Sequence, residues 1–291
     1  MILFTFAGND RAQARLLFNE TQYKLIRSRE IRSFYIRCKK ERIMQEIDAA
    51  KNNSELEQLA KKYDFCDVSG FTGINLVGLK RIMKVITEVL YKYPKLRGRL
   101  CFIGTHVEFE KLLAKLEQGD NAILKRFNLQ HICSIENVKE LSGMLRNHMA
   151  EIIARNETYL AMALNAFGLF DAMLFDHNDY EGYAYLKFIT NLRANAESGF
   201  HPQGCHMPEF VAYHELGHLL DYMCGLCKND AFQAYYSRMT ESEIRTGLSN
   251  YALTSSEEFI AEAFAEFMCN AHPRSISRKT VELLDQAYAG L

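Results

Sequence analysis

The chain has 291 residues, of which 48% are hydrophobic and 24% are charged, and its formal net charge is −1. This length can bury a full core in one or two domains, and the charge gives no overall attraction to nucleic acid or membranes. No run of about 18 uncharged apolar residues occurs, which argues against a membrane span. The apolar segment 1–8 is too short for a signal-peptide core, and the cysteines are scattered. We therefore expect reduced thiols in a cytoplasmic protein, with release by a non-classical route left open.

The N-terminal segment 11–62 is predicted to be helical, and its part from 11 to 42 is basic. The second half of that part contains Arg27, Arg29, Arg32, Arg37, Lys39, Lys40 and Arg42. A solvated helical arm is the favoured interpretation, because no aromatic–basic interleaving or base-reading motif accompanies the charges. The alternative is a docking element for an acidic partner or nucleic acid. We expect 1–62 to form this basic helical arm and 63–291 to form the main domain.

The main domain is predicted to be α+β, rich in helices, with a small mixed sheet in 63–205 and a helical part in 206–291. A change in composition near residue 67 marks the expected boundary. An amphipathic helix is then predicted from Leu76 to Tyr93, ending at Pro94. The later predicted elements are a buried strand at 99–104, helices at 107–118 and 137–155, a hairpin of 159–167 with 170–175, a helix at 185–196, a loop at 199–204, and helix, loop and helix from 208 onward.

The segment 208–225 carries His214, Glu215, His218 and Asp221 on an otherwise apolar helix. A helix that is apolar nearly all round is buried, so its titratable groups require an explanation. The two histidines are four residues apart and share one face, which Asp221 continues; Glu215 is rotated by about 100°. This HExxH pattern predicts a zinc site in which the pKa of a water falls from about 16 to about 7. A chance match to a short pattern, or two buried core histidines, is the less favoured reading.

A catalytic zinc normally has three protein ligands, and a second apolar helix supplies candidates for the third. We expect Thr254 to be the N-cap of this helix, with Glu257 completing a capping box. Glu258, Glu262 and Glu266 then follow at four-residue spacing on one face, where like charges repel. Glu266, near the end, can be solvated, whereas a nearby cation better explains the other two. The sequence thus predicts Glu258 as the third ligand and Glu262 as a group that orients a ligating histidine, with Asp221 as a second supporting group beside the ligands.

The combination of HExxH with a later Tyr-x6-Glu-x3-Glu resembles the lethal-factor-like zincins, a group that includes the Pro-Pro endopeptidases. The matching positions are His214, Glu215, His218, Tyr251, Glu258 and Glu262. The resemblance covers about 202–270 well, the preceding region in outline and the first 60 residues not at all. It implies a zincin-like metallopeptidase fold in which the two histidines and Glu258 bind zinc. It further implies that Glu215 is the general base and that Tyr251 donates its hydroxyl to the oxyanion.

Other cysteine and histidine residues could bind a metal ion, but we do not expect them to form part of the site. Cys224 and Cys227 have zinc-knuckle spacing without a second pair, so we expect incidental buried thiols. His201 and His206 could touch substrate or metal, but loop histidines are most often on the surface, and we expect that here. His177 follows the predicted hairpin, which could line a substrate cleft.

The sequence therefore predicts a zinc-dependent endopeptidase of the gluzincin type that acts on a polypeptide. One alternative is a binding or structural protein of a phage or mobile element with a non-catalytic zinc site, which a fourth protein ligand would favour. This setting is suggested by 198–204, which look like the segment before HExxH in metallopeptidase domains of such elements. The other alternative is a zinc amidase that acts on cell-wall peptides.

Overall fold

The chain divides into two compact units, 1–46 and 47–291. The division lies earlier than the boundary expected at residue 62, because Asn52 caps a new helix, α3 (Asn53–Lys62), that belongs to the second unit. Leu56 and Ala60 of α3 are buried. The computed structural model describes residues 20–120, 135–155, 161–166, 170–176 and 182–291.

The first unit contains most of helix α2 (Glu20–Ala49), which agrees with the helical prediction for this part of the arm. The side chains of Arg37, Lys39 and Arg42 are exposed, and those of Phe34 and Tyr35 are exposed beside them. Residues 11–19, and the side chains of Arg27, Arg29 and Arg32, lie outside the described part. The docking role of the arm stays a prediction.

The second unit contains a small mixed sheet with the strand order β1-β2-β4-β3. β1 (Val68–Gly70) and β2 (Leu100–Thr105) are parallel, as are β2 and β4 (Phe170–Phe175). β3 (Ala161–Ala166) pairs with β4 as the expected antiparallel hairpin and forms an edge of the sheet. β1 was not predicted, because its three residues lie where the change in composition suggested a boundary.

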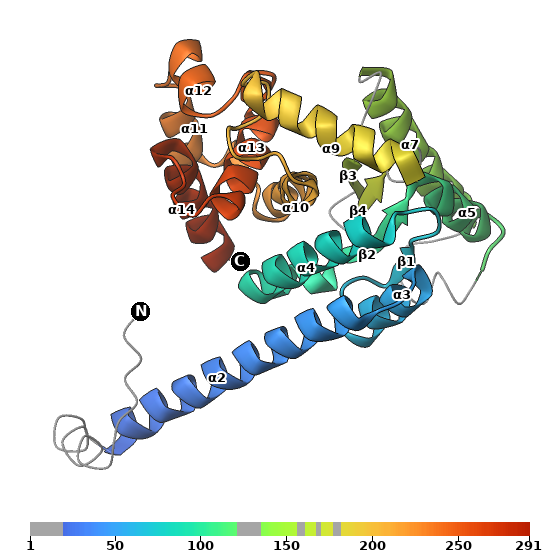
Figure 1. The fold of residues 1–291 in the computed structure, drawn as a ribbon, viewed down its shortest axis with the longest axis horizontal. Helices are drawn as coiled ribbons and strands as arrows, with labels where there is room; N and C mark the ends of the chain where they lie inside the picture. Colours follow the sequence, from blue (N-terminus) through green and yellow to red (C-terminus); the bar gives the residue numbers. More distant parts are fainter. Residues whose placement is uncertain (1–19, 121–134, 156–160, 167–169, 177–181) are drawn as a thin grey trace. The chain divides into compact units, whose positions relative to one another are not determined.

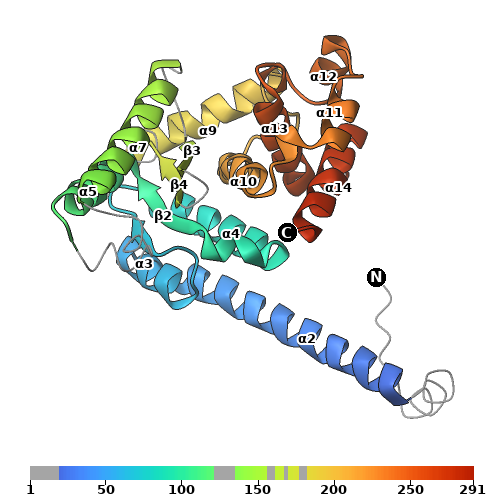
Figure 2. The same cartoon turned by 180° about the vertical axis from the view of Figure 1, so that it is seen from behind.

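Helices cover both faces of this sheet (Figures 1 and 2). On one face, α5 (His106–Glu117) and α7 (Ile135–Arg155) share a hydrophobic core with alternate strand residues. The strand residues of this core include Phe102, Met162, Leu164, Ala172 and Leu174. Strands β2 and β4 are buried along their whole length. Helix α10 (Pro208–Cys224) packs on the hairpin of β3 and β4. The sheet therefore holds α10 in place.

The described part of the chain after residue 206 contains helices only, as expected. α4 (Leu76–Lys92) ends before Pro94 as predicted and packs against α10. α10 ends at Gly225, which adopts the left-handed conformation with φ 63°, a helix stop that favours glycine. The remaining elements are η1 (Pro94–Gly98), α9 (Gly182–Glu197), η3 (Leu226–Lys228), α11 (Asp230–Tyr236), α12 (Glu241–Gly247), η4 (Tyr251–Leu253), α13 (Ser256–Cys269) and α14 (Ser275–Ala289).

The contact between α10 and α13 is unusually close at Gly217. A Cβ atom built on this glycine would lie 3.0 Å from the Ala261 Cα and 3.3 Å from the Phe264 Cβ. Such distances are tighter than ordinary van der Waals contacts, so a side chain here would require the neighbouring helix to shift by a few tenths of an ångström, and the two backbones lie close together. This approach brings the polar faces of the two helices together.

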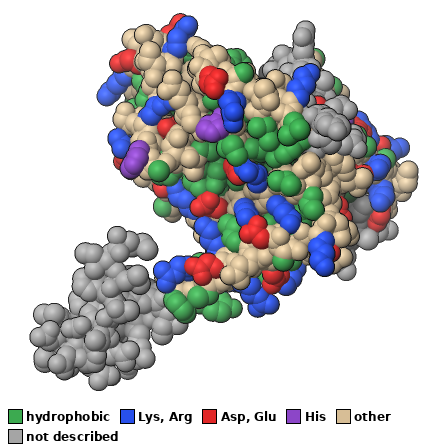
Figure 3. Space-filling model, in the orientation of Figure 1, with side chains coloured by type: hydrophobic (Ala, Val, Ile, Leu, Met, Phe, Trp, Pro, Cys, Tyr) green, Lys and Arg blue, Asp and Glu red, His purple; other side chains and the backbone are tan. Residues whose placement is uncertain are grey.

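The described surface carries both signs of charge. Figure 3 shows Lys and Arg side chains interspersed with Asp and Glu on the visible face, in keeping with the net charge of −1. None of the described helices combines the length and the apolar composition needed to cross a membrane.

Candidate metal centre

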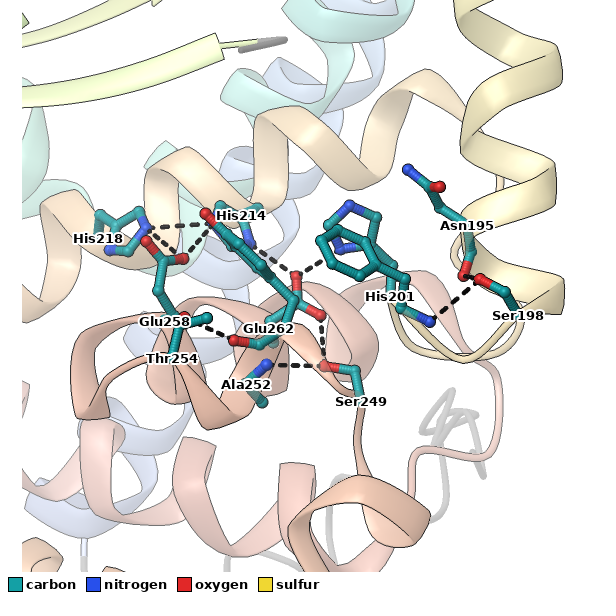
Figure 4. Close-up of polar contacts among 12 residues, drawn as sticks. Asn195, Ser198, His201, His214, His218, Ser249, Ala252, Thr254, Glu258 and Glu262 are labelled. Atoms are coloured by element: carbon teal, nitrogen blue, oxygen red, sulfur yellow. Dashed lines mark hydrogen bonds and ion pairs between the residues drawn. The ribbon is translucent and has the colours of Figure 1, made fainter. Parts of the chain in front are cut away.

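Two histidines of α10 point toward one another from adjacent turns of the helix (Figure 4). The Nε2 atoms of His214 and His218 lie 3.1 Å apart. Pro208 begins the helix and Gly225 ends it, and the apolar residues between them bury it almost completely. Each histidine side chain is only 9% exposed, so the pair is held by the packing of the helix.

Helix α13 brings Glu258 to this pair. Its N-cap is Ser255 and not Thr254 as expected: the Ser255 hydroxyl accepts a hydrogen bond from the Glu258 N–H at 3.2 Å. Thr254 has helical backbone angles and ends the preceding turn, where its hydroxyl donates to the Tyr251 carbonyl. Glu257 therefore completes no capping box with Thr254, and its carboxylate accepts from the Ser256 hydroxyl. The helix thus begins one residue later than expected, and Glu258 still lies in its first turn.

Three potential ligand atoms form a compact triangle. The Glu258 Oε2 atom lies 3.0 Å from the His214 Nε2 atom and 3.3 Å from the His218 Nε2 atom. Two imidazole nitrogens and a carboxylate oxygen in this arrangement could hold a metal ion. The three side chains also interact with one another electrostatically without a bound metal ion. Burial raises the pKa of Glu258, but the charges and hydrogen bonds of both histidines outweigh it and lower that pKa below its ordinary value.

Glu262, one turn after Glu258, contacts the opposite side of His214. Its Oε1 atom lies 3.1 Å from the His214 Nδ1 atom and 3.1 Å from the His201 Nδ1 atom. Its Oε2 atom accepts a hydrogen bond from the Ser249 hydroxyl at 2.7 Å. Burial would raise the pKa of this carboxyl, yet the two histidines lower it. The fully buried Glu262 thus fixes the orientation of the His214 ring.

His201 is part of this cluster, so the prediction that it lies on the surface is wrong. Its ring is buried and packs edge-on against Tyr251, with centroids 5.4 Å apart. Two backbone hydrogen bonds tie its loop to the segment before α13, from Asn250 N–H to Gly199 O and from Tyr251 N–H to Phe200 O. No local pattern in the sequence marks His201 as buried, because its contacts come from α13 and the segment before it.

Glu215 belongs to α10, and its side chain reaches the edge strand β3. Its carboxylate is buried and accepts a hydrogen bond from the backbone N–H of Ala163. Burial raises the pKa of Glu215, although the nearby histidines oppose this effect. The group is therefore a stronger base than an ordinary glutamate.

Tyr251 flanks the ligand triangle on the side of His214. The two rings have centroids 5.9 Å apart, and the Tyr251 hydroxyl donates to the Glu258 carboxylate. Burial and the surrounding carboxylates raise the pKa of this phenol, so it remains protonated at neutral pH. The structure thus brings together all six residues of the sequence pattern.

Asp221 has a role different from that expected. Its Oδ1 atom accepts a hydrogen bond from the Cys227 N–H at 2.7 Å and so caps the turn that follows α10. Among the described residues, its Oδ2 atom and the His218 Nδ1 atom have no hydrogen-bond partner. Asp221 and His218 interact through charge alone.

The remaining candidates lie apart from the triangle. Glu266, for which solvation was left open, is buried, and its carboxylate accepts hydrogen bonds from the Arg274 N–H and the Asn270 amide. Cys224 and Cys227 are free and half-buried, and burial raises their pKa values to about 11 and about 12. His206 is half-buried and joins no ligand group within the described residues, whereas His177 lies outside them.

Comparisons with known proteins leave the site to be interpreted from its own geometry. No protein-family model, no curated protein and no solved structure matches the chain. The described residues nevertheless combine a potential three-ligand metal site, a buried carboxylate of raised pKa and a protonated phenol. This combination can bind a cation, accept a proton and donate a hydrogen bond within one small region.

Proposed function

We propose that the protein is a zinc-dependent endopeptidase with a zincin-like fold, in which His214, His218 and Glu258 hold the zinc ion. The ligand triangle carries this proposal. Its sides of 3.0, 3.1 and 3.3 Å approach the separation of about 3.3 Å expected for tetrahedral ligands with bonds of about 2.0 to 2.1 Å. Two histidines with one glutamate form a ligand set of catalytic zinc that leaves a fourth position open.

The ligand count favours catalysis over a purely structural site. Within the described part of the chain, the candidate group contains three residues, whereas a closed structural site needs a fourth protein ligand. The resemblance of the HExxH and Tyr-x6-Glu-x3-Glu positions to the lethal-factor-like zincins points the same way. A structural zinc protein of a phage or mobile element is therefore the weaker proposal.

The residues around the triangle supply the steps of peptide hydrolysis. Zinc, when bound, would acidify a water molecule and polarise the scissile carbonyl. Glu215 is placed to take the proton of the attacking water and to pass it to the leaving amine, and its raised pKa suits both transfers. Tyr251, now bound to Glu258, would turn its hydroxyl to the oxyanion of the transition state.

The decisive experiment separates metal binding from catalysis. Glu215→Gln should retain one zinc per chain and lose peptide hydrolysis, whereas His214→Ala should lose the metal. Zinc content is measured by atomic emission, and cleavage is measured by new protein N-termini in a proteome digest. The proposal fails if the wild-type protein holds no stoichiometric zinc after reconstitution, or if Glu215→Gln cleaves like the wild type.

The substrate class requires its own comparison. A peptide panel assayed beside peptidoglycan fragments distinguishes an endopeptidase from a zinc amidase of cell-wall peptides. All described cysteines are free, which supports the proposal of a reducing, cytoplasmic setting. Arg37, Lys39 and Arg42 of α2 are exposed, and we propose that this basic arm binds an acidic partner or nucleic acid.

A further inference from the structure

A second tyrosine lies beside the metal centre on α10. Tyr222 follows His218 by four residues and Glu215 by seven, so all three share one face of the helix. Its ring is nearly parallel to the His218 imidazole, with centroids 6.2 Å apart and an interplanar angle of 19°. It is half-buried, and therefore accessible from solvent. Tyr222 thus lies next to His218, whereas Tyr251 lies next to His214.

The Tyr222 hydroxyl is a donor with no acceptor among the described residues. Within the described part of the chain it makes no hydrogen bond, in contrast to Tyr251, whose hydroxyl is bound to Glu258. Burial and the charges of Glu215, Glu258, Asp221 and Glu257 raise the pKa of this phenol, so it keeps its proton at neutral pH. A half-buried donor beside a metal centre is suited to an acceptor that arrives with a ligand.

The surrounding charges limit the chemistry of that acceptor. Four carboxylates act on the phenol, and the two positive charges of a bound zinc ion would offset only part of their negative charge, so a carboxylate or phosphate brought close to them is repelled. A neutral oxygen, such as a peptide carbonyl, meets no such repulsion. The position therefore suits the interior of a polypeptide better than its free C-terminus.

We propose that Tyr222 contacts the substrate by donating a hydrogen bond from its hydroxyl to a backbone carbonyl of a peptide bound at the His218 end of the site. This inference rests on the proposed peptidase function. It assigns the substrate class as internal peptide segments and not C-terminal residues. The competing explanation is that Tyr222 only packs its ring against His218.

Removal of the hydroxyl alone distinguishes these explanations. Tyr222→Phe keeps the ring and its stacking, whereas Tyr222→Leu removes both. Tyr235→Phe is the matched control, because Tyr235 is a half-buried phenol whose pKa is raised by burial alone. Zinc affinity should be the same in wild type, Tyr222→Phe and Tyr235→Phe.

Binding of hydroxamates to the zinc-loaded full chain tests the contact without turnover. The probes are acetohydroxamate and two hydroxamates extended by a tripeptide amide toward either end of a peptide. Tyr222→Phe should weaken the tighter peptide probe about 3- to 10-fold, as expected for one lost hydrogen bond, and leave acetohydroxamate unchanged. The corresponding probe with a free carboxylate should bind the wild type less tightly than the amide.

The outcomes separate this inference from the proposed function. Equal affinity of Tyr222→Phe and wild type for both peptide probes overturns the inference, and an effect confined to Tyr222→Leu assigns the residue to packing. Tighter binding of the free carboxylate overturns the assignment to internal segments. If the zinc-loaded wild type binds none of the hydroxamates and cleaves no peptide, the proposed function itself fails.

Discussion

Glu262 is a fully buried carboxylate that joins three side chains from separate segments: His201, His214 and Ser249. Glu262→Gln should lower zinc affinity by about 10- to 100-fold, because the His214 ring loses its charged partner. Competition with a chromophoric chelator measures this affinity.

Glu266→Gln is the control for this change. Glu266 lies one turn further along α13 and is equally buried, but it contacts Arg274 and Asn270. The control should reduce the stability of the fold and leave zinc affinity unchanged. Equal affinity losses in the two variants would remove Glu262 from the orientation of the ligand.

In the proposed mechanism the Tyr251 hydroxyl, which donates to Glu258 in this structure, would donate instead to the oxyanion of the transition state. Tyr251→Phe should lower kcat by about 10²-fold with little change in KM, as for the loss of one oxyanion donor. Steady-state kinetics on a peptide found in the proteome digest measure both constants. An unchanged kcat would exclude this tyrosine from the mechanism.

Residues of the site differ in how well the sequence predicts them. His214, Glu215 and His218 share one helix, and Glu258 and Glu262 share another, so spacing alone reveals each set. His201 reaches Glu262 only through tertiary folding, and no local period marks such a contact. Serine and threonine are both favoured at N-caps, so residue preference could not distinguish Ser255, the observed N-cap, from Thr254, the predicted one.

The contact between helices α10 and α13 depends on Gly217. Gly217→Ala should destabilise the fold by about 1 to 3 kcal/mol, because the new methyl group meets the Ala261 backbone of α13. Denaturant unfolding measures the change, and zinc affinity should fall as the two ligand helices separate.

Gly143→Ala in α7 is the control for Gly217→Ala, because a side chain at Gly143 would meet no neighbouring atom. A Cβ atom at Gly143 meets no heavy atom within 4 Å. The substitution should therefore stabilise the fold by about 0.5 to 1 kcal/mol, since alanine restricts the unfolded chain more than glycine does. Stabilisation by both changes would show that α10 and α13 have room to separate at no cost.

Hydrophobic periodicity predicts most of the elements that surround the site. The strong apolar face of α4, the buried run of β2 and the paired runs of β3 and β4 are local signals. β1 has three residues, and its pairing partner β2 lies about thirty residues later, so its strand character depends on a non-local contact. The sequence therefore predicts a small sheet without its first strand.

Zinc should stabilise the whole second unit, because its ligands come from two helices that are far apart in sequence. A ligand bound only by the folded state adds about 2.7 kcal/mol at 100 times its dissociation constant. The melting temperature should rise with zinc and fall again with a chelator in the wild type and in Glu257→Ala, but not in Glu258→Ala. The same rise in Glu258→Ala would place the ion elsewhere, for example at Cys224 and Cys227.

At the scale of the chain, the sequence predicts a helical N-terminal segment but not where the first unit ends. Helix α2 continues from Glu20 to Ala49 across the division at residue 46, so no break in pattern marks it. The start of α3 at Asn53 offers such a mark, but its buried residues place it with the second unit.

The three candidate ligand side chains differ in exposure to solvent, and this difference affects how a bound metal ion could exchange. The histidines are 9% exposed, whereas Glu258 is 24% exposed and lies in the first turn of its helix. Rotation of this one carboxylate would open a path to solvent while α10 and α13 stay packed. Exchange of one divalent ion for another would then not require the two helices to separate, and the ion bound would be set by the relative affinities and the supply of the competing ions.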